Sequence, residues 1–376
     1  MNEHRKTILF CDNTLWGLVN FRGDIIRHFV EKGYRVVLSA PEKEDKQMRT
    51  TLPEGVEYEP IAMGRASTSP INDLRYAWRL HKVFRRVNPD YIFTYTIKPN
   101  VYGSLLSRLH HKKLTAMMAG MGYVFTNNNL AARFGRWLYR LGLRHADHLL
   151  LLNSENLETV CRLNLCPRSK IILLEGGEGV DLNKFTATDN QASHTTFLFI
   201  GRILWDKGYE QFSQAARLVK QHFPEAEFHL LGSLDPSYPM SVPRERIMKD
   251  QEEGIVTYRG FTSDMQSVMR QPGIVVTLPS FYGEGMNRSL MEACAAGKPI
   301  ITTDIAGCRE LVDNNKNGFV VPPKDTEALA KAMTDYLMLD DQQKAQLSTA
   351  SRELAERRFD IRRVIEVYEK LVETCC

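Results

Sequence analysis

Short runs of aliphatic and β-branched residues alternate with longer, helix-like segments along almost the whole chain. Such runs are expected to form strands at residues 6–10, 35–40, 91–96, 114–119, 148–153, 171–175, 196–200, 227–231, 255–259, 274–278, 299–303 and 319–321. Unbroken apolar strands separated by helices are typical of parallel sheets whose two faces are both covered. A polar stretch at 186–194 interrupts the series. The pattern therefore predicts an α/β fold with two Rossmann-like, doubly wound parallel-sheet domains.

The polar interruption also predicts the domain organisation. A chain of 376 residues suits two domains of ordinary size. We expect an N-terminal domain over 1–186, a C-terminal domain over 187–355, and a final helical segment over 356–376 that packs back on the N-terminal domain. Because ligands of open parallel sheets bind at the carboxyl ends of the strands, we expect the site in the cleft where two such domains face each other.

The composition excludes several classes of protein. Apolar residues make up 43% of the chain and charged residues 25%, which is ordinary for a globular protein and argues against disorder, collagen and coiled coil. No apolar run approaches the 18 residues of a membrane span, and no secretory leader precedes the first strand, so a cytoplasmic location is expected. The seven cysteines form no Cys-x-x-Cys pair, so neither a disulfide framework nor a zinc cage is expected.

The net charge of +4 hides a strong asymmetry. Residues 1–150 carry 23 basic and 13 acidic side chains, a net charge of +10, whereas residues 151–376 carry 26 basic and 32 acidic side chains, a net charge of −6. A basic half joined to an acidic half indicates that the first half meets something anionic. The candidates are a membrane surface, a phosphorylated acceptor and nucleic acid.

The strongest motif lies at residues 279–299, where a buried strand is followed by a glycine-containing loop and a helix that opens near Asn287. Glycines allow a close approach of the backbone to a ligand, and the start of a helix attracts anions. Glu284 and Glu292 lie eight residues apart, about 12 Å along a helix, which is comparable to the length of a nucleotide diphosphate sugar. Each glutamate by itself is more simply explained as a solvent-exposed charge, whereas the whole motif at 279–299 favours a ligand site.

A second motif follows the first strand of the C-terminal half. Gly201 permits a sharp exit from that strand, Arg202 is a bidentate phosphate donor, and Lys207 adds a flexible positive charge. Two cations after a strand end suit a diphosphate, although a surface arginine and lysine beside a helix start would look the same. A weaker glycine-containing turn at 15–23, with Gly17, follows the first strand of the chain.

Three loops of the basic half follow strand positions and could line an acceptor. Their candidate residues are Arg65, Lys98, Gly122 and Tyr123. Each has a simple alternative, because glycines are common in turns and lysine and arginine are usually solvated.

A predicted helix at 129–145 carries basic and apolar side chains on neighbouring faces. Arg133, Arg136, Arg140 and Arg144 fall within an arc of about 80° at the helical repeat of 100° per residue. The adjacent apolar stripe consists of Leu130, Phe134, Trp137, Leu138 and Leu141. A basic amphipathic helix with a tryptophan is typical of a membrane interface, so we expect these arginines and Trp137 to contact an anionic membrane surface. The alternative is a helix packed on its own sheet with its arginines in water.

The sequence lacks the motifs that are typical of several other functions. Neither a helix-turn-helix, RNP-type, KH nor zinc-finger pattern appears, so nucleic acid is not an expected partner. We expect no metal ion and no cofactor, because no Asp-x-Asp follows a likely site strand and the histidines are not clustered. A G-x-S-x-G elbow for serine hydrolysis is also missing.

Together these motifs resemble glycosyltransferase family 4. The residues that carry the resemblance are Glu284 and Glu292 with the Gly297-Lys298-Pro299 string, preceded by Gly201-Arg202 and Lys207-Gly208. The family has the GT-B fold of two facing Rossmann-like domains. The first half resembles bacterial enzymes that extend polyprenyl-diphosphate-linked sugars, such as the α-1,3-N-acetylgalactosaminyltransferases of N-glycan assembly. The residues that carry this resemblance are Phe21-Arg22, Arg65, Lys98 and Gly120-x-Gly122.

The resemblance implies a retaining, metal-independent transfer of a sugar from a UDP-sugar to a lipid-diphosphate-linked glycan at the inner face of the cell membrane. It implies catalytic roles for Arg202, Lys207 and Glu284, with Glu292 on the ribose. The implied donor-binding residues are Gly17, Gly201, Arg202, Lys207, Gly260, Phe261, Glu284, Gly285, Met286, Asn287, Arg288, Ser289 and Glu292. Some relatives carry a histidine in the first-domain loop that touches the sugar, whereas residues 120–126 here contain none.

Two other functions fit the same pattern. A UDP-N-acetylglucosamine 2-epimerase would share the fold, and would hydrolyse or epimerise the nucleotide sugar without an acceptor. A non-catalytic nucleotide-sugar-binding module would bind the donor without turnover. The sequence does not choose among N-acetylgalactosamine, N-acetylglucosamine, galactose and glucose as the donor sugar.

Overall fold

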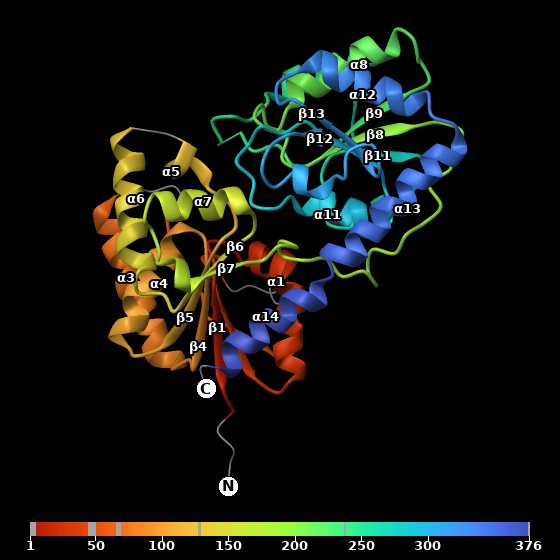
Figure 1. Ribbon diagram of the computed structural model, residues 1–376. Coiled ribbons are helices and arrows are strands. Elements are labelled where there is room, and N and C mark those ends of the chain that lie inside the picture. The colour runs from red at the N-terminus through yellow and green to blue at the C-terminus, as the bar shows by residue number, and fades with distance from the viewer. Residues whose placement is uncertain (1–4, 44–49, 65–68, 127–128, 237, 375–376) are drawn as a thin grey trace. The chain divides into compact units, whose positions relative to one another are not determined.

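The chain forms two compact units, described by a computed structural model over residues 5–43, 50–64, 69–126, 129–236 and 238–374 (Figure 1). The first unit comprises Met1–Glu178 and Arg362–Cys376, and the second comprises Gly179–Ile361. The polar stretch at 186–194 lies inside the second unit. The reason is that the residues before it already pack there: Val180 is buried and forms a β-bridge with Asp360, and Arg352 binds the Phe185 carbonyl at 2.7 Å.

The first unit is built on a seven-stranded parallel sheet in the order β3-β2-β1-β4-β5-β6-β7. Its strands are β1 Thr7–Cys11, β2 Arg35–Ser39, β3 Val56–Tyr58, β4 Tyr91–Tyr95, β5 Lys113–Met118, β6 His148–Leu151 and β7 Ile171–Leu173. The pattern of apolar runs missed β3, because three residues with an exposed glutamate in the middle give no periodic signal.

Helices cover both faces of this sheet, as expected for buried parallel strands. They are α1 Leu15–Glu31, α3 Pro70–Val87, α4 Ile97–Leu109, α5 Gly122–Thr126, α6 Leu130–Leu143, α7 Ser154–Arg162 and α14 Ile361–Glu373. Figure 1 shows α3, α4 and α6 on one side of the strands and α1 and α14 on the other. The side chains of the strands alternate accordingly, with Leu9 and Ile92 in the core under α3 and α4, and Phe10 and Phe93 stacked at 5.1 Å on the other face.

The second unit has a six-stranded parallel sheet in the order β10-β9-β8-β11-β12-β13. Its strands are β8 Thr196–Ile200, β9 Glu227–Leu231, β10 Thr257–Tyr258, β11 Ile274–Leu278, β12 Ile300–Thr303 and β13 Gly318–Val321. The helices are α8 Tyr209–Lys220, α9 Arg244–Glu252, α10 Met265–Met269, α11 Arg288–Ala295, α12 Thr326–Leu337 and α13 Asp341–Arg358. The prediction of two doubly wound α/β domains is confirmed.

The C-terminal segment consists of two helices that belong to different units. Helix α13 lies in the second unit, whereas nearly all of α14 lies in the first. The apolar face of α14 is buried there: Tyr368 packs against Phe93 with ring centroids 4.6 Å apart, and its hydroxyl lies 3.0 Å from that of Tyr95. The end of the chain therefore completes the core of the N-terminal unit.

Each sheet has one point at which the strand order reverses direction. In the first unit β1 lies between β2 and β4, and in the second β8 lies between β9 and β11. Loops diverge at the carboxyl ends of these neighbouring strands, where open α/β sheets bind their ligands. Functional residues are therefore expected in the loops after β1 and β4 of the first unit, and in the loops after β8 and β11 of the second.

Candidate functional site

The loop after β8 and the loop after β11 come into direct contact. Gly208 caps the start of α8 with a φ of 86°, and a Cβ atom there would lie 2.1 Å from the Pro279 carbonyl oxygen. Only glycine therefore lets the β8 loop pack against the end of β11. The Phe281 amide donates a 2.9 Å hydrogen bond to the Asp206 carbonyl, which fixes the two loops together.

An ion pair joins the two loops at this contact. The Lys207 ammonium bonds the Glu284 carboxylate, and the two side chains are only 11% and 12% exposed. Ser280 Oγ and Asn287 Nδ2 each lie 3.4 Å from the same Glu284 oxygen. The structure therefore brings together two of the residues that the sequence predicted as catalytic, although they are 77 positions apart.

Arg202, the second predicted cation, lies in the same loop. Its guanidinium stacks on the ring of Tyr238 at 4.8 Å, and it forms no ion pair with any residue that the structure describes. Lys207 Nζ lies 5.0 Å from the ring of Tyr282. One cation is therefore neutralised by Glu284, while the other rests on an aromatic face.

Sequence reasoning missed three groups around these cations: Asp206, Tyr238 and Tyr282. The pKa of Asp206 is raised by burial, against the opposing effect of Lys207 and Arg202. The tyrosines come from two other loops and are linked by a side-chain hydrogen bond. A carboxylate next to the lysine was visible in the motif, but nothing in the sequence placed the tyrosines there.

Helix α11 begins beside Glu284, as the motif predicted. Asn287 caps it by accepting a 3.1 Å hydrogen bond from the Leu290 amide, and its own amide donates to the Gly307 carbonyl at 2.8 Å. A Cβ atom on Gly307 would lie 2.6 Å from the Gly285 carbonyl oxygen, so this loop too is closely packed. The amides of Arg288 and Ser289, which are the remaining ones in the first turn, make this end of the helix favourable for an anion.

Glu292 is buried within α11, with an exposed fraction of 9%. Arg288, one turn earlier, donates from Nε to its carboxylate at 2.9 Å and from Nη1 to the Gly179 carbonyl at 2.6 Å. Burial raises the pKa of Glu292, and the neighbouring Arg288 opposes that rise. Glu292 is thus held by Arg288, whose own side chain is directed to this carboxylate and to the chain at Gly179.

The remaining donor candidates of the second unit differ in their surroundings. Gly201, with a φ of 146°, donates its amide to the Leu231 carbonyl at 3.0 Å. Met286 is 8% exposed, whereas Phe261, after the edge strand β10, is 60% exposed. Gly260 has a φ of 73°, and its carbonyl accepts a 2.8 Å hydrogen bond from Gly232.

In the first unit, the loops after β1 and β4 also meet. Gly17, in the first turn of α1, donates its amide to Thr14 Oγ1 at 2.7 Å, and a Cβ atom there would lie 3.1 Å from the Asp12 carboxylate. Thr96 donates to Asp12 at 3.3 Å and has a φ of 66°, which is rare for a β-branched residue. Burial raises the pKa of Asp12 to about 6.

A buried ion pair between Arg22 and Glu178 lies next to Asp12, and spacing alone did not predict it. The two side chains are 4% and 10% exposed. The guanidinium of Arg22 stacks on the ring of Tyr95 at 4.2 Å, and Asp12 adds to the negative potential around it. Glu178 is the last residue of the first unit before the chain enters the second.

The predicted acceptor residues are spread over separate loops. Lys98 is engaged within the unit, 2.7 Å from Asp73 Oδ1 and 2.7 Å from the Gly64 carbonyl. Gly122 has a φ of 58° at the start of α5. Arg65 and the side chain of Tyr123 lie outside the described residues.

The predicted amphipathic helix is α6, and its apolar stripe is largely exposed. Phe134 is 53% exposed and Trp137 55%, with ring centroids 5.7 Å apart, whereas Leu138 packs against the core and so leaves the stripe. Arg136 and Arg140 donate to the carbonyls of Val124 and Leu163. The remaining members are exposed: Leu130, Arg133, Leu141 and Arg144.

A second exposed stripe lies on α3. Ile71, Leu74 and Trp78 are 62%, 71% and 58% exposed, and at spacings of three and four they share one face of the helix. Lys82 Nζ lies 3.5 Å above the Trp78 ring. Within the described residues, no helix has the length and apolar character needed to span a membrane.

Comparisons with known proteins find similar sequences. Residues 194–338 match the model of "Glycosyl transferases group 1", and residues 17–177 match that of a "Glycosyl transferase 4-like domain". The N,N'-diacetylbacillosaminyl-diphospho-undecaprenol α-1,3-N-acetylgalactosaminyltransferase of Campylobacter jejuni is 27% identical over 95% of either chain. The UDP-Gal:α-D-GlcNAc-diphosphoundecaprenol α-1,3-galactosyltransferase of Escherichia coli is 23% identical over 70% of either chain.

Solved structures show the same fold. The Anabaena protein HepE in complex with UDP and glucose superposes with a TM-score of 0.80 at 19% identity, over 98% of this chain and all of that one. A glycosyltransferase from Rickettsia africae gives 0.79 at 18% identity over 99% of either chain. Two Rossmann-like units with these motifs define a glycosyltransferase of the GT-B class, and the chain belongs to glycosyltransferase family 4.

Proposed function

We propose that this glycosyltransferase transfers a hexose or N-acetylhexosamine from a UDP-sugar to a glycan carried on a polyprenyl diphosphate, with retention of the anomeric configuration. The contact between Lys207 and Glu284 carries the proposal, because it sets a cation and a carboxylate together at the strand-order reversal of the second sheet. The name of the Campylobacter jejuni relative, which specifies a diphospho-undecaprenol acceptor, supports the acceptor class. A fold shared with a UDP complex supports the donor class.

The chemistry requires stabilisation of a leaving diphosphate. As the bond from the sugar to the β-phosphate breaks, negative charge collects on the phosphate, and positioned cations lower the barrier. In this proposal Arg202 and Lys207 bind the diphosphate beside the start of α11, so a metal ion is not required. Glu284 exchanges its ion pair with Lys207 for hydroxyls of the donor sugar, and Glu292 holds the ribose.

Retention follows if the acceptor hydroxyl attacks on the face that the diphosphate leaves. The C–O bond to the phosphate breaks as the bond to the acceptor oxygen forms, and the leaving phosphate oxygen takes the hydroxyl proton. No side chain then needs to form a covalent intermediate. The acceptor is held by the basic first unit, where Lys98, Gly122, Arg65 and Tyr123 are the proposed contacts, and Gly17 approaches the donor.

A lipid-linked acceptor places the enzyme at a membrane surface. The apolar side chains of α6 and α3 are exposed although helices of a folded domain normally bury such stripes, and both helices carry basic residues. A helix of this kind lies in the membrane interface with its apolar face down. We therefore propose peripheral binding through Trp137, Phe134 and the arginines of α6 to the cytoplasmic leaflet.

The enzymatic proposal is tested by UDP release from a panel of UDP-sugars, with a crude polyprenyl-diphosphate-sugar fraction as acceptor. We expect one donor to give acceptor-dependent release, and Glu292→Ala to reduce it by at least tenfold with an unchanged circular dichroism spectrum. Arg357→Ala, an exposed substitution on α13, is the control. Release without any acceptor, or wild-type transfer by the Glu292 variant, would contradict the proposal.

Membrane binding is tested by flotation with vesicles of phosphatidylglycerol and phosphatidylethanolamine. Each basic residue near an anionic surface contributes about 1 kcal/mol, so reversal of the four α6 charges to glutamate should abolish flotation. The matched control reverses four exposed arginines and lysines of the second unit: Lys249, Arg270, Lys316 and Arg357. Equal flotation of the two variants would rule out α6 as the contact surface.

A further inference from the structure

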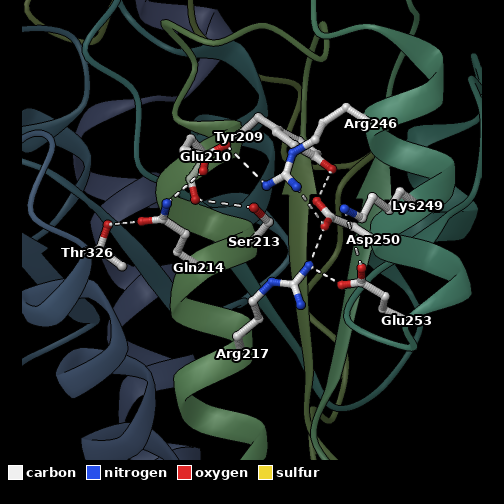
Figure 2. Close-up of polar contacts among 10 residues, drawn as sticks. All are labelled: Tyr209, Glu210, Ser213, Gln214, Arg217, Arg246, Lys249, Asp250, Glu253 and Thr326. Atoms are coloured by element: carbon white, nitrogen blue, oxygen red, sulfur yellow. Dashed lines mark hydrogen bonds and ion pairs between the residues drawn. The ribbon is translucent and has the colours of Figure 1, made fainter.

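A buried polar cluster in the second unit lies outside the donor motifs and was not apparent from the sequence. Its centre is Asp250 on α9, which Figure 2 shows with its polar partners and which is completely buried. Tyr209 donates its hydroxyl to one oxygen at 2.6 Å, and Arg217 and Arg246 approach the other at 2.5 and 3.2 Å. A buried carboxylate is stable only with such partners, and this one has three.

The position of Tyr209 connects this cluster with the site. Tyr209 is fully buried, is the first residue of α8, and follows Lys207 by two positions. Its ring lies edge-on to Trp205 with centroids 5.7 Å apart, and Gly208 between them is closely packed on Pro279. Burial and the carboxylate raise the pKa of Tyr209 well above its ordinary value, so the phenol remains a donor.

Residues 238–242, which precede α9, bind the first part of the loop between β8 and α8. The Trp205 amide donates to the Met240 carbonyl at 2.8 Å, and the Val242 amide donates to the Ile203 carbonyl at 3.2 Å. Arg202 stacks on Tyr238 at the start of this segment. The chain then continues into α9, which begins at Arg244.

These contacts form a closed ring that includes the loop carrying Arg202 and Lys207. Residues 203–205 are bonded to residues 240–242, residues 240–242 lead into α9, and Asp250 on α9 returns to Tyr209 directly after the loop. We propose that Asp250 and Tyr209 are positioning residues for Lys207, and set the affinity of this unit for the diphosphate of a nucleoside diphosphate. The ligand class rests on the proposed function, whereas the ring itself does not.

The chain offers a matched pair of substitutions. Tyr209→Phe removes only the hydroxyl that joins Asp250 to the start of α8. Arg217→Gln removes a cation from the same carboxylate and from Glu253, but two turns further along α8 and away from Lys207. The second variant should destabilise the unit at least as much as the first, because it leaves buried negative charge with one fewer cation.

The test measures UDP binding by isothermal titration calorimetry, and hydrogen exchange of the peptide that covers 201–208 in the free protein. We expect Tyr209→Phe and Asp250→Ala to weaken UDP binding about threefold to tenfold, which is the net effect of one ordinary hydrogen bond, and to speed exchange in 201–208. Arg217→Gln should change UDP affinity less than twofold. Thermal unfolding of each variant reports the structural cost separately.

The outcomes separate this inference from the proposed function. Faster exchange in 201–208 for Tyr209→Phe but not for Arg217→Gln supports the positioning role even if the wild type binds no UDP, a result that would overturn the proposed function alone. Unchanged exchange and UDP affinity in Tyr209→Phe would overturn the positioning role. So would losses of affinity that simply follow thermal stability across the three variants.

Discussion

The two sheets reverse their strand order at equivalent points, yet the charges gathered there differ in kind. In the second unit Lys207 and Glu284 meet beside Arg202, whose guanidinium has an aromatic partner and no ion pair among the described residues. In the first unit the Arg22–Glu178 pair is buried under aromatic rings, and Asp12 adds a further buried carboxylate.

The difference indicates two uses of the same architecture. Positive charge that is left partly unsatisfied suits an anionic ligand, whereas a sealed ion pair mainly fixes structure. Here Arg22 fixes Glu178, the residue at which the chain leaves the first unit. Removal of the charges at the strand ends of the second sheet is therefore expected to reduce activity. Removal of the charges at the strand ends of the first sheet is expected to reduce stability.

The largest effect is expected from Arg22→Gln. It leaves Glu178 and Asp12 buried without their cation, which should lower the free energy of unfolding by about 3–5 kcal/mol. Urea denaturation followed by tryptophan fluorescence measures the loss. Arg27→Gln, on the same helix but in an ion pair whose arginine is 43% exposed, should cost less than about 1 kcal/mol. Similar losses of stability in the two variants would show that the buried Arg22–Glu178 pair stabilises the first unit no more than an exposed ion pair does.

Lys207→Ala is the counterpart in the second unit. We expect transfer to fall by about 10²–10³-fold, as for removal of one charge-stabilising donor. Thermal stability should fall less than in Arg22→Gln, because Ser280 Oγ and Asn287 Nδ2 remain beside the Glu284 carboxylate. Lys316→Ala, an exposed lysine of the same unit, should transfer at the wild-type rate. If the Lys207 variant instead loses stability and keeps its activity, the second edge is structural too.

Asp12→Asn gives the smallest effect and sharpens the comparison by pH. Because the pKa of Asp12 is raised to about 6, the folded state binds more protons than the unfolded state between about pH 4 and 6, and stability falls as pH rises through that range. Asparagine mimics the protonated acid, so the variant should be more stable above pH 6.5, by up to about 3 kcal/mol, and equal to the wild type near pH 4. If the stabilities of the variant and the wild type change with pH in the same way, burial of the Asp12 charge is not the cause of the pH dependence.

Much of the fold was predictable because its signals are local. A strand buried on both faces must be apolar throughout, so the alternation of apolar runs and helices revealed two parallel sheets. The glycines and cations after the strand ends were equally visible, as was the Asn287 cap of α11. The run at 255–259 formed only the two-residue strand β10, and β3 was not predicted, because edge strands carry a weak pattern.

The sequence by itself thus determined the class of fold and the order of its elements, and it indicated the loops of the candidate site. Tertiary structure alone decided which charges meet: Lys207 with Glu284, Arg22 with Glu178, and Tyr209 with Asp250, separated by 77, 156 and 41 positions. It also decided that Trp137 is exposed and Leu138 packed. The physical reason is that the strands of a parallel sheet do not pair in chain order. Loops that are distant in the sequence therefore become neighbours only when the strands pair in the folded sheet.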